Sequence, residues 1–173
     1  MKPMAGKTSL EEAVEKLKAG IGAENVLEVK YQPPRNVFVL VKTEKLKDAV
    51  SYIMKNLNYQ YVITITGVDL IKQNQMEVIY HLTDYSNTIS LRVRIPRDNP
   101  KVPTITDIIP GATLYEREVH DMFGIVFEGH PNLVKLLLPD GWPEDLHPLR
   151  KDVTVQQIRE RLEEERKKGV RGI

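Results

Sequence analysis

The sequence predicts an α+β fold in which a mixed or antiparallel sheet carries helices on one face. Apolar residues recur every three to four positions in two early segments and every second position in the segments that follow. A third observation is a change of texture after residue 95, where four prolines interrupt any regular element before residue 111. The order expected over the first hundred residues is α-β-β-α-β-β-β.

Capping and turn signals predict the first four elements. Ser9 has a glutamate three residues later, the spacing of a capping box, and glycines end the amphipathic helix that it begins. Two strands rich in Val, Leu and Phe follow over residues 25–31 and 36–42, and the prolines between them force a turn. Thr43 is the expected N-cap of a second helix that ends near residue 58.

Three strands with alternating polarity complete the sheet. The apolar sets expected on one face are Tyr61, Ile63 and Ile65, then Met76, Val78, Tyr80 and Leu82, then Ile89, Leu91, Val93 and Ile95. Ser90, Arg92 and Arg94 occupy the opposite face of the last strand, which indicates one wet or partner-facing side. Hairpin turns are predicted at residues 72–74 and 84–87.

The whole chain is expected to divide into three parts, with boundaries after residues 110 and 153. The predicted parts are an α+β domain (1–110), a docking arm (111–153) and a C-terminal charged helix (154–173). The docking arm begins with a short helix over about residues 112–123 and is otherwise irregular, which is uncommon in a compact domain unless the segment is functional. The last helix begins at Thr154 and has so narrow an apolar stripe that it lies either in solvent or against another chain.

Composition excludes several classes of function. The chain has 25 basic and 24 acidic residues, so no global field marks it as a binder of nucleic acid or of acidic membranes. It has no cysteine, so by itself it cannot hold an iron–sulfur cluster or another thiolate centre. No signal-peptide pattern is visible, and no apolar run approaches the roughly 18 residues of a membrane span. We expect the chain itself to be soluble.

Residues 114–152 crowd three of the four histidines among charged and aromatic side chains, which predicts either a site or a partner surface. The catalytic alternative is a small stand-alone metal enzyme using His120, Asp121 and His130. Its spacing is poor, because adjacent helical residues point about 100° apart, whereas helical zinc ligands sit at i and i+4. Nucleophile elbows and phosphate-binding loops are missing from the sequence. A third interpretation is a soluble adaptor without a redox role.

The same segment contains an ordered series of motifs: Glu116-Arg117-Glu118, Asp121-Met122-Phe123-Gly124-Ile125, Phe127, Gly129-His130-Pro131, Leu138-Pro139-Asp140 and His147-Pro148-Leu149-Arg150-Lys151-Asp152. This series resembles the signature of the thirty-kilodalton (30 kDa) subunit family of respiratory complex I, which is shared with membrane-bound nickel–iron hydrogenases. The residues from Trp142 to Leu146, just before the last motif, look more like the hydrogenase branch.

The resemblance implies a non-catalytic peripheral subunit of a membrane-anchored, ion-translocating oxidoreductase, of the hydrogenase or a related ferredoxin-linked type. The alternative within the family is the corresponding subunit of NADH-quinone oxidoreductase proper. No activity is expected of the chain alone, and it would carry no cofactor and reach the membrane only through other subunits, on the cytoplasmic side.

The implied partners are a large catalytic subunit and a small iron–sulfur subunit, which would hold the iron–sulfur clusters and, in hydrogenases, the nickel–iron centre. The residues implied to bind them are Glu116, Arg117, Glu118, Asp121, Phe123, Phe127, His130, Trp142, His147, Arg150 and Lys151.

Overall fold

The structure is a computed structural model that describes residues 9–170 and Gly172. Residues 1–8, on which the prediction of no signal peptide partly rests, and residues 171 and 173, at the end of the expected last helix, lie outside the described residues. A five-stranded sheet with the order β1-β2-β5-β4-β3 forms the body. Its strands are β1 (Val26–Gln32), β2 (Asn36–Val41), β3 (Tyr61–Leu70), β4 (Gln75–Thr83) and β5 (Thr88–Pro96).

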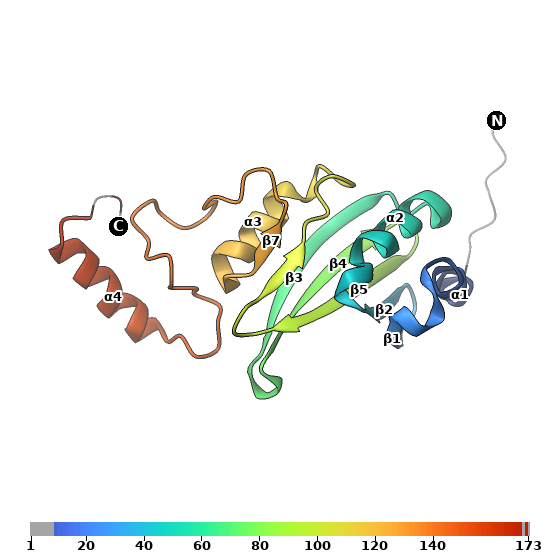
Figure 1. The fold of residues 1–173 in the computed structure, drawn as a ribbon, viewed down its shortest axis with the longest axis horizontal. Coiled ribbons are helices and arrows are strands. Elements are labelled where there is room, and N and C mark those ends of the chain that lie inside the picture. The colour runs from blue at the N-terminus through green and yellow to red at the C-terminus, as the bar shows by residue number, and fades with distance from the viewer. Residues whose placement is uncertain (1–8, 171, 173) are drawn as a thin grey trace.

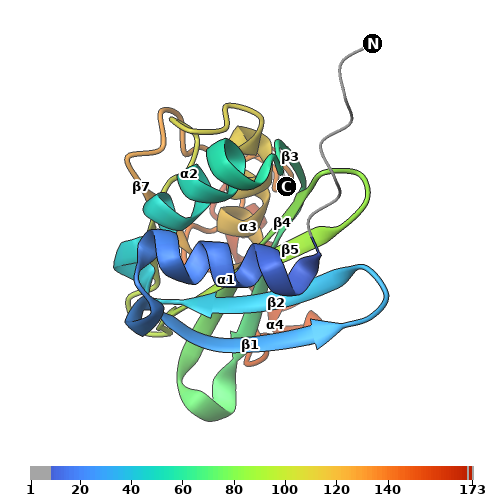
Figure 2. The same cartoon turned by 90° about the vertical axis from the view of Figure 1, so that its right-hand side faces the viewer.

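Three helices cover one face of this sheet, as Figures 1 and 2 show. They are α1 (Leu10–Ile21), α2 (Leu46–Leu57) and α3 (Ala112–Phe123). Ser9 caps α1 by accepting the N–H of Glu12 at 3.1 Å, and Asn58 ends α2 in the left-handed conformation. The predicted α+β class, with its order α-β-β-α-β-β-β and its helices on one face, is confirmed.

The sheet is mixed because β2 pairs with β5 in parallel, from Asn36 opposite Thr88 to Leu40 opposite Arg92. Its other neighbouring strands are antiparallel. A parallel pair needs a long crossover connection, which α2, β3 and β4 supply here. The hairpin between β4 and β5 has the predicted turn, in which the carboxylate of Asp84 accepts two backbone N–H groups.

The core lies between the sheet and the helices. The apolar sets of β4 and β5 are almost fully buried, as their period of two predicts: Met76, Val78, Tyr80, Leu82, Ile89, Leu91, Val93 and Ile95. Leu46, Val50 and Ile53 of α2 pack into the same cluster. The cluster continues through Val119 and Phe127, so residues beyond 110 share the core of the sheet.

The predicted N-cap of α2 is wrong. Thr43 begins a short 3₁₀ helix (Thr43–Lys45), and α2 starts three residues later with Lys45 at its N-cap. The hydroxyl of Thr43 donates instead to the carbonyl oxygen of Arg94 at 3.0 Å. The Thr43 hydroxyl, which the sequence pattern predicts to cap α2, therefore forms a tertiary hydrogen bond with the end of β5 instead.

The apolar face predicted for β3 is also partly wrong. The β3–β4 register shifts between Val62 and Thr64, so Ile63 is an extra residue in the strand. Tyr61 and Ile63 are 48% and 50% exposed, and only Ile65 of the predicted set is buried. The extra residue breaks the alternation that the period of two requires.

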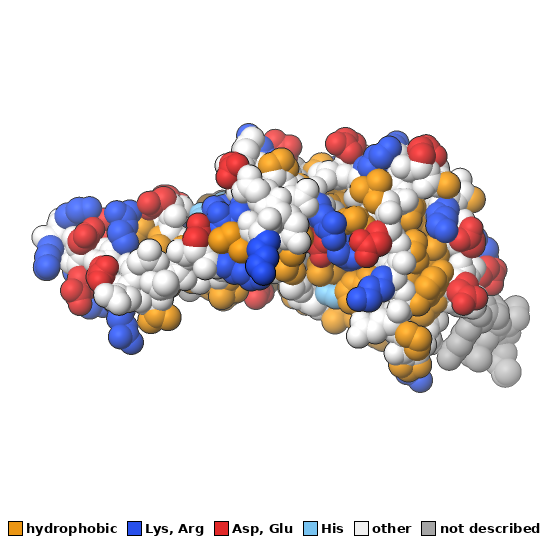
Figure 3. Space-filling model, turned by 90° about the horizontal axis from the view of Figure 1, so that it is seen from below, with side chains coloured by type: hydrophobic (Ala, Val, Ile, Leu, Met, Phe, Trp, Pro, Cys, Tyr) orange, Lys and Arg blue, Asp and Glu red, His pale blue; other side chains and the backbone are white. Residues whose placement is uncertain are grey.

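The uncovered face of the sheet carries an ion-pair group. The carboxylate of Glu77 accepts the Nε of Arg92 at 3.0 Å and the Nε of Arg94 at 2.8 Å. Burial alone would raise the pKa of Glu77, but these bonds outweigh it and the pKa is lowered. Figure 3 looks onto this face, where charged side chains lie among hydrophobic ones.

The remaining strands and the last helix lie toward the C-terminus. Strands β6 (Lys101–Pro103) and β7 (Val126–Glu128) form a parallel pair beside the main sheet. Two further 3₁₀ turns lie earlier in the chain, at Ala23–Asn25 and Ile71–Gln73. The last helix, α4 (Val155–Lys167), begins with the predicted capping box of Thr154 and Gln157. Figure 1 shows α4 far from the sheet, at the end of a long irregular segment. Within the described residues, no helix is long and apolar enough to cross a bilayer.

Candidate functional site

The irregular segment that follows β7, residues 129–153, is here called the arm loop. Helix α3 binds the first half of this loop. The carbonyl oxygen of Thr113 lies 3.2 Å from the Nε2 of His130. One turn further on, Arg117 donates to the carbonyl oxygens of Val134 and Lys135 at 2.8 and 2.6 Å. Positions four apart share one face of a helix, so this face of α3 binds the backbone of the arm loop.

Asp121 continues this face and holds the next three residues of the arm loop. Its Oδ2 accepts the N–H groups of Leu136, Leu137 and Leu138 at 2.9, 2.8 and 3.2 Å. The side chain is almost fully buried, with 2% of the residue exposed. A buried carboxylate needs such donors, because an unmet charge away from water is costly. The cation Arg117 therefore binds backbone carbonyl oxygens of the arm loop, and the anion Asp121 binds the backbone N–H groups that follow them.

The second half of the arm loop caps the C-terminus of α3. Gly124 ends the helix with φ of 72°. The last carbonyls of a helix have no partner within it. Here the Nδ1 of His147 lies 3.1 Å from the backbone carbonyl oxygen of Asp121. The backbone N–H of Leu149 donates to the carbonyl oxygen of Met122 at 3.0 Å, and the Nε of Arg150 donates to the carbonyl oxygen of Phe123 at 2.8 Å.

The His-Pro-Leu-Arg motif is thus a helix cap supplied from a distant part of the chain, and burial lowers the pKa of His147. Neutral His147 in this position donates through Nδ1 to the carbonyl, which can only accept.

The sheet ties down the end of the arm loop through Asp69 of β3. Asp69 accepts the guanidinium of Arg97 at 2.9 and 3.0 Å and the backbone N–H of Lys151 at 2.9 Å. Arg97 also donates to Asp152 at 2.6 Å. Burial would raise the pKa of Asp69, but the bonds from Arg97 and Lys151 prevail and the pKa is lowered. The arm loop is therefore fixed at both ends and along α3.

Glu116 lies on the inner side of α3 and is fully buried. Its carboxyl group meets the hydroxyl of Thr104 at 2.5 Å and the N–H of Ile105 at 2.9 Å. Burial raises the pKa of Glu116 to about 7, against 4.5 for an ordinary glutamate. This residue anchors α3 to the segment after β6.

The residues of the metal-enzyme alternative are held by different groups. His120 has its Nδ1 2.9 Å from the oxygen of Ile125, whereas Asp121 holds the leucine amides and His130 lies against Thr113. In the part of the chain that the structure describes, no three His, Asp or Glu side chains gather in a way that could hold a metal ion.

The residues implied to bind partners fall into three groups by their burial. Glu116, Asp121, Phe123 and Phe127 are buried within this chain. Glu118 and Lys151 are exposed, and the remaining ones, Arg117, His130, Trp142, His147 and Arg150, are half-buried with bonds to the backbone of the arm or of α3. Partner contact by this set stays a prediction. Within this chain, most of these residues hold the docking arm in shape.

Sequence reasoning missed two kinds of residue. Asp69 and Arg97 tie the arm loop to the sheet, but no local spacing connects them to the signature. Leu136 and Leu137 expose apolar side chains, 36% and 58% of each residue being accessible, as does Leu149 at 54%. The signal for these was present, since a run of three leucines in an irregular segment is unusual on a surface without a partner.

Comparison with known proteins gives the family. The family described as "Respiratory-chain NADH dehydrogenase, 30 Kd subunit" matches residues 39–159. A relative from Roseiflexus castenholzii, a subunit of an NADH-quinone oxidoreductase, is 42% identical over 120 residues, which are 66% of this chain and 68% of that protein. Another from Methanosarcina mazei, a subunit of an F(420)H(2) dehydrogenase, is 31% identical over 131 residues, which are 75% of this chain and 82% of that protein.

Solved structures agree with this. A chain of the membrane-bound sulfane sulfur reductase, an archaeal respiratory membrane complex, superposes with a TM-score of 0.75 and 30% identity over 88% of this chain and 91% of that one. A trypsin-resistant fragment of Nqo5 gives a TM-score of 0.59 and 28% identity, covering 70% and 99% of the two chains. None of the four is named a hydrogenase, so that branch stays a prediction. The resemblance seen in residues 114–152 is confirmed: the chain belongs to the family of the 30 kDa subunit of the respiratory-chain NADH dehydrogenase.

Proposed function

We propose that this chain is a non-catalytic peripheral subunit of a membrane-anchored, ion-translocating oxidoreductase. In this role it holds the large catalytic subunit against the iron–sulfur subunit, so that the distances between their cofactors stay fixed. The observation that carries the proposal is the arm loop, which has almost no regular structure yet is bonded to α3 from His130 to Arg150, and to Asp69 of β3 and to Arg97 at its end.

A loop held in one shape is suited to binding. Ordering a flexible segment on association costs free energy, and a segment that is already ordered avoids that cost. The arm loop also turns Val134, Leu137 and Leu149 toward solvent, each at least half exposed. Exposed apolar side chains in a segment of fixed shape favour a protein partner over solvent.

The relatives support the setting. They are named as subunits of an NADH-quinone oxidoreductase, an F(420)H(2) dehydrogenase and a sulfane sulfur reductase, complexes that differ in their electron donors or acceptors. A shared subunit then has a structural role common to them, on the cytoplasmic side of the membrane, with iron–sulfur clusters and any nickel–iron centre in its partners. Hydrogenase-type and ferredoxin-linked complexes remain our leading assignment, and the 42% identity to an NADH-quinone oxidoreductase subunit favours that complex as the second candidate.

Replacement of Leu137 by Asp tests the docking role. Leu137 is 58% exposed, and only its backbone N–H is bonded to Asp121, so the variant should fold. A tagged Leu137→Asp chain expressed in its native host should recover at least about 10-fold less of the large subunit, because a charge is buried without a partner. Leu27→Asp on β1 is the matched control, since Leu27 is 57% exposed.

Full recovery of the large subunit with Leu137→Asp would sink the proposal, provided that the control behaves like the unmodified chain. The same purification, with the accompanying subunits identified by mass spectrometry, separates the hydrogenase-type from the NADH-quinone oxidoreductase assignment. Arg150 is a poorer choice for this test, because its guanidinium caps α3 and a reversal of its charge would disturb the docking arm itself.

A further inference from the structure

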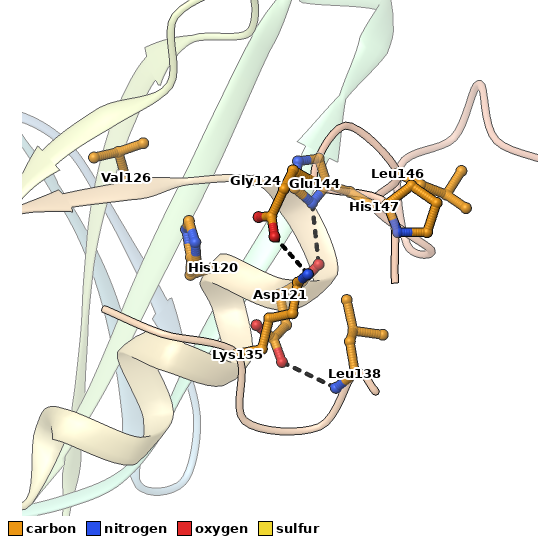
Figure 4. A pocket seen from close by; sticks show the side chains of 10 residues that line it. His120, Asp121, Gly124, Val126, Lys135, Leu138, Glu144, Leu146 and His147 are labelled. Atoms are coloured by element: carbon orange, nitrogen blue, oxygen red, sulfur yellow. Dashed lines mark hydrogen bonds and ion pairs between the residues drawn. The ribbon is translucent and has the colours of Figure 1, made fainter. Parts of the chain in front are cut away.

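A pocket of about 200 Å³ lies where the C-terminus of α3 meets the arm loop (Figure 4). Its walls include His120 and Asp121 from α3, Val126 from β7, and Lys135, Glu144 and His147 from the arm loop. Ligand sites for small metabolites take roughly 300–1,000 Å³. This volume instead suits the head of one side chain.

The carboxylate of Asp121 is incompletely bonded. Its Oδ2 accepts three backbone amides, whereas its Oδ1 is buried without a hydrogen-bond partner. In Figure 4 the oxygen bonded to Leu138 points away from the pocket, and the other oxygen faces the side where the His120 ring lies. A buried charged acceptor that is left unpaired is unfavourable.

Two imidazole rings add further acceptors. His120 and His147 each place Nδ1 against a carbonyl oxygen, at 2.9 and 3.1 Å, and a carbonyl can only accept. In the neutral ring the proton therefore sits on Nδ1, and Nε2 is left as an acceptor. The pocket thus combines a carboxylate oxygen with two imidazole nitrogens.

The charges of the pocket favour a cation. The lysine in the wall, Lys135, already donates to the oxygen of Trp142 at 2.6 Å and to Glu144 at 2.5 Å. Lys135 and Glu144 offset each other, which leaves the charge of Asp121. The C-terminal end of α3 adds a partial negative charge of the helix dipole, which the guanidinium of Arg150 at the oxygen of Phe123 offsets in part.

The arrangement does not suit a metal ion. Among the described residues no three His, Asp or Glu side chains lie close enough together to ligate one. Acceptors that are too widely spaced for a metal can be bridged by a larger group with several donors. Guanidinium is planar and carries five N–H donors and no acceptor, which matches a pocket rich in acceptors.

We propose that this pocket receives the guanidinium group of an arginine from the subunit that docks on the arm loop. The inference rests on the proposed function, because it requires a partner to face this loop. The arginine would donate to the Oδ1 of Asp121 and to the rings of His120 and His147. In this way the partner would recognise the pocket of the docking arm as well as its apolar surface.

The isolated full chain allows a direct test with ethylguanidinium chloride as the probe, followed by nuclear magnetic resonance. The amides of Leu136–Leu138 and the ring protons of His147 should shift saturably. Asp121→Asn keeps an oxygen for the three amides but places an NH₂ donor where Oδ1 lies. This variant should bind the probe at least about 10-fold more weakly, while the leucine amide signals keep their dispersion.

A second variant leaves Asp121 unchanged. Val126 is 36% exposed at the rim of the pocket, so Val126→Phe should fill the pocket and abolish binding of the probe. Leu27→Phe on β1 is the matched control and should bind normally. The proposal is overturned by an absence of saturable shifts, by equal affinity of Asp121→Asn and the unmodified chain, or by preferential binding of zinc.

Purification of the whole complex separates the two proposals. Loss of the large subunit with both Leu137→Asp and Asp121→Asn supports the arginine. If Leu137→Asp loses the partner and Asp121→Asn retains it, the arm docks without an arginine in the pocket, and this inference fails while the proposed function stands. If Leu137→Asp retains the partner, the proposed function fails, and the inference about a partner arginine fails with it.

Discussion

Gly124 is the point at which α3 ends and the arm loop returns to cap it. Its φ of 72° is one that L-residues other than Asn and Asp rarely adopt. A Cβ atom on Gly124 would also lie 2.3 Å from the Nε2 of His147. Glycine is therefore required at this position both by the backbone turn and by the ring that packs over it.

Gly124→Ala should lower the free energy of unfolding by at least about 1–3 kcal/mol, through backbone strain and displacement of His147. Gly111→Ala is the control at the other end of the same helix, because Gly111 has φ of −63° and no atom within 4 Å of an added Cβ. That substitution should change stability by no more than about 0.5 kcal/mol. Urea unfolding of the two variants checks the difference, and equal effects would contradict the account of the cap.

Glu116 should make stability depend on pH. Its pKa of about 7 in the folded chain lies above 4.5, the ordinary value, so the folded form retains the proton more strongly. The stabilisation this gives is complete below pH 4.5 and is lost as the pH rises through 7. Glu116→Gln cannot ionise, and relative to the unmodified chain it should gain up to about 3 kcal/mol between about pH 4.5 and 8.

Urea unfolding across this pH range measures the effect, with the exposed Glu118→Gln on the same helix as its control. Parallel stability curves for Glu116→Gln and the unmodified chain would show that burial of this carboxyl has no such consequence.

Among the elements, those with strong periodicity could be predicted from the sequence. The buried faces of α2, β4 and β5 follow directly from their periods, because each is set by contacts along one element. β3 could not be predicted fully, since its extra residue at Ile63 depends on the register with β4. The parallel pairing of β2 with β5 likewise depends on two strands that are distant in the chain.

The shifted register of β3 predicts opposite effects for two neighbouring isoleucines. Ile65→Ala should lower the free energy of unfolding by about 2–5 kcal/mol, because Ile65 is 3% exposed in the core. Ile63→Ala should change it by less than about 0.5 kcal/mol, because Ile63 is 50% exposed. Thermal or urea unfolding decides; a large loss in Ile63→Ala would mean that the strand keeps a strict alternation.

At the scale of the whole molecule, the chain has a packed body and a docking arm that leads to a separate helix (Figure 1). α4 buries none of its described residues completely, and an exposed ion pair links Arg161 to Asp145 at 2.9 Å. Such pairs contribute only about 0–1 kcal/mol. The body should therefore be almost independent of α4.

Deletion of residues 154–173 should lower the free energy of unfolding by no more than about 1 kcal/mol. Deletion of residues 147–173 also removes the cap of α3 and the bond from Lys151 to Asp69, and should remove at least about 2 kcal/mol more, at about 0.5–1.5 kcal/mol per hydrogen bond. Chemical unfolding of both truncated chains checks the ranking. Equal stability would show that the arm loop does not support the body.

The candidate site could be located from the sequence, but the hydrogen-bond partners of its residues could not be predicted. The signature identified the right segment, because crowded charges and special backbone residues are visible as composition. What those residues do depends on partners far away in the chain: Asp69 meets Lys151, and Arg150 meets Phe123. No periodicity encodes such pairs, so charges that suggested an outer surface are largely bonded within the chain.

Trp142 offers a practical consequence of this architecture. It is the single tryptophan of the chain, it is half-buried in the arm loop, and its indole N–H donates to the oxygen of Leu146 at 2.7 Å. Its fluorescence therefore reports on one segment, whereas far-ultraviolet circular dichroism reports mainly on the helices and strands of the body. The two signals, recorded on one sample, can therefore distinguish local unfolding of the arm loop from unfolding of the sheet.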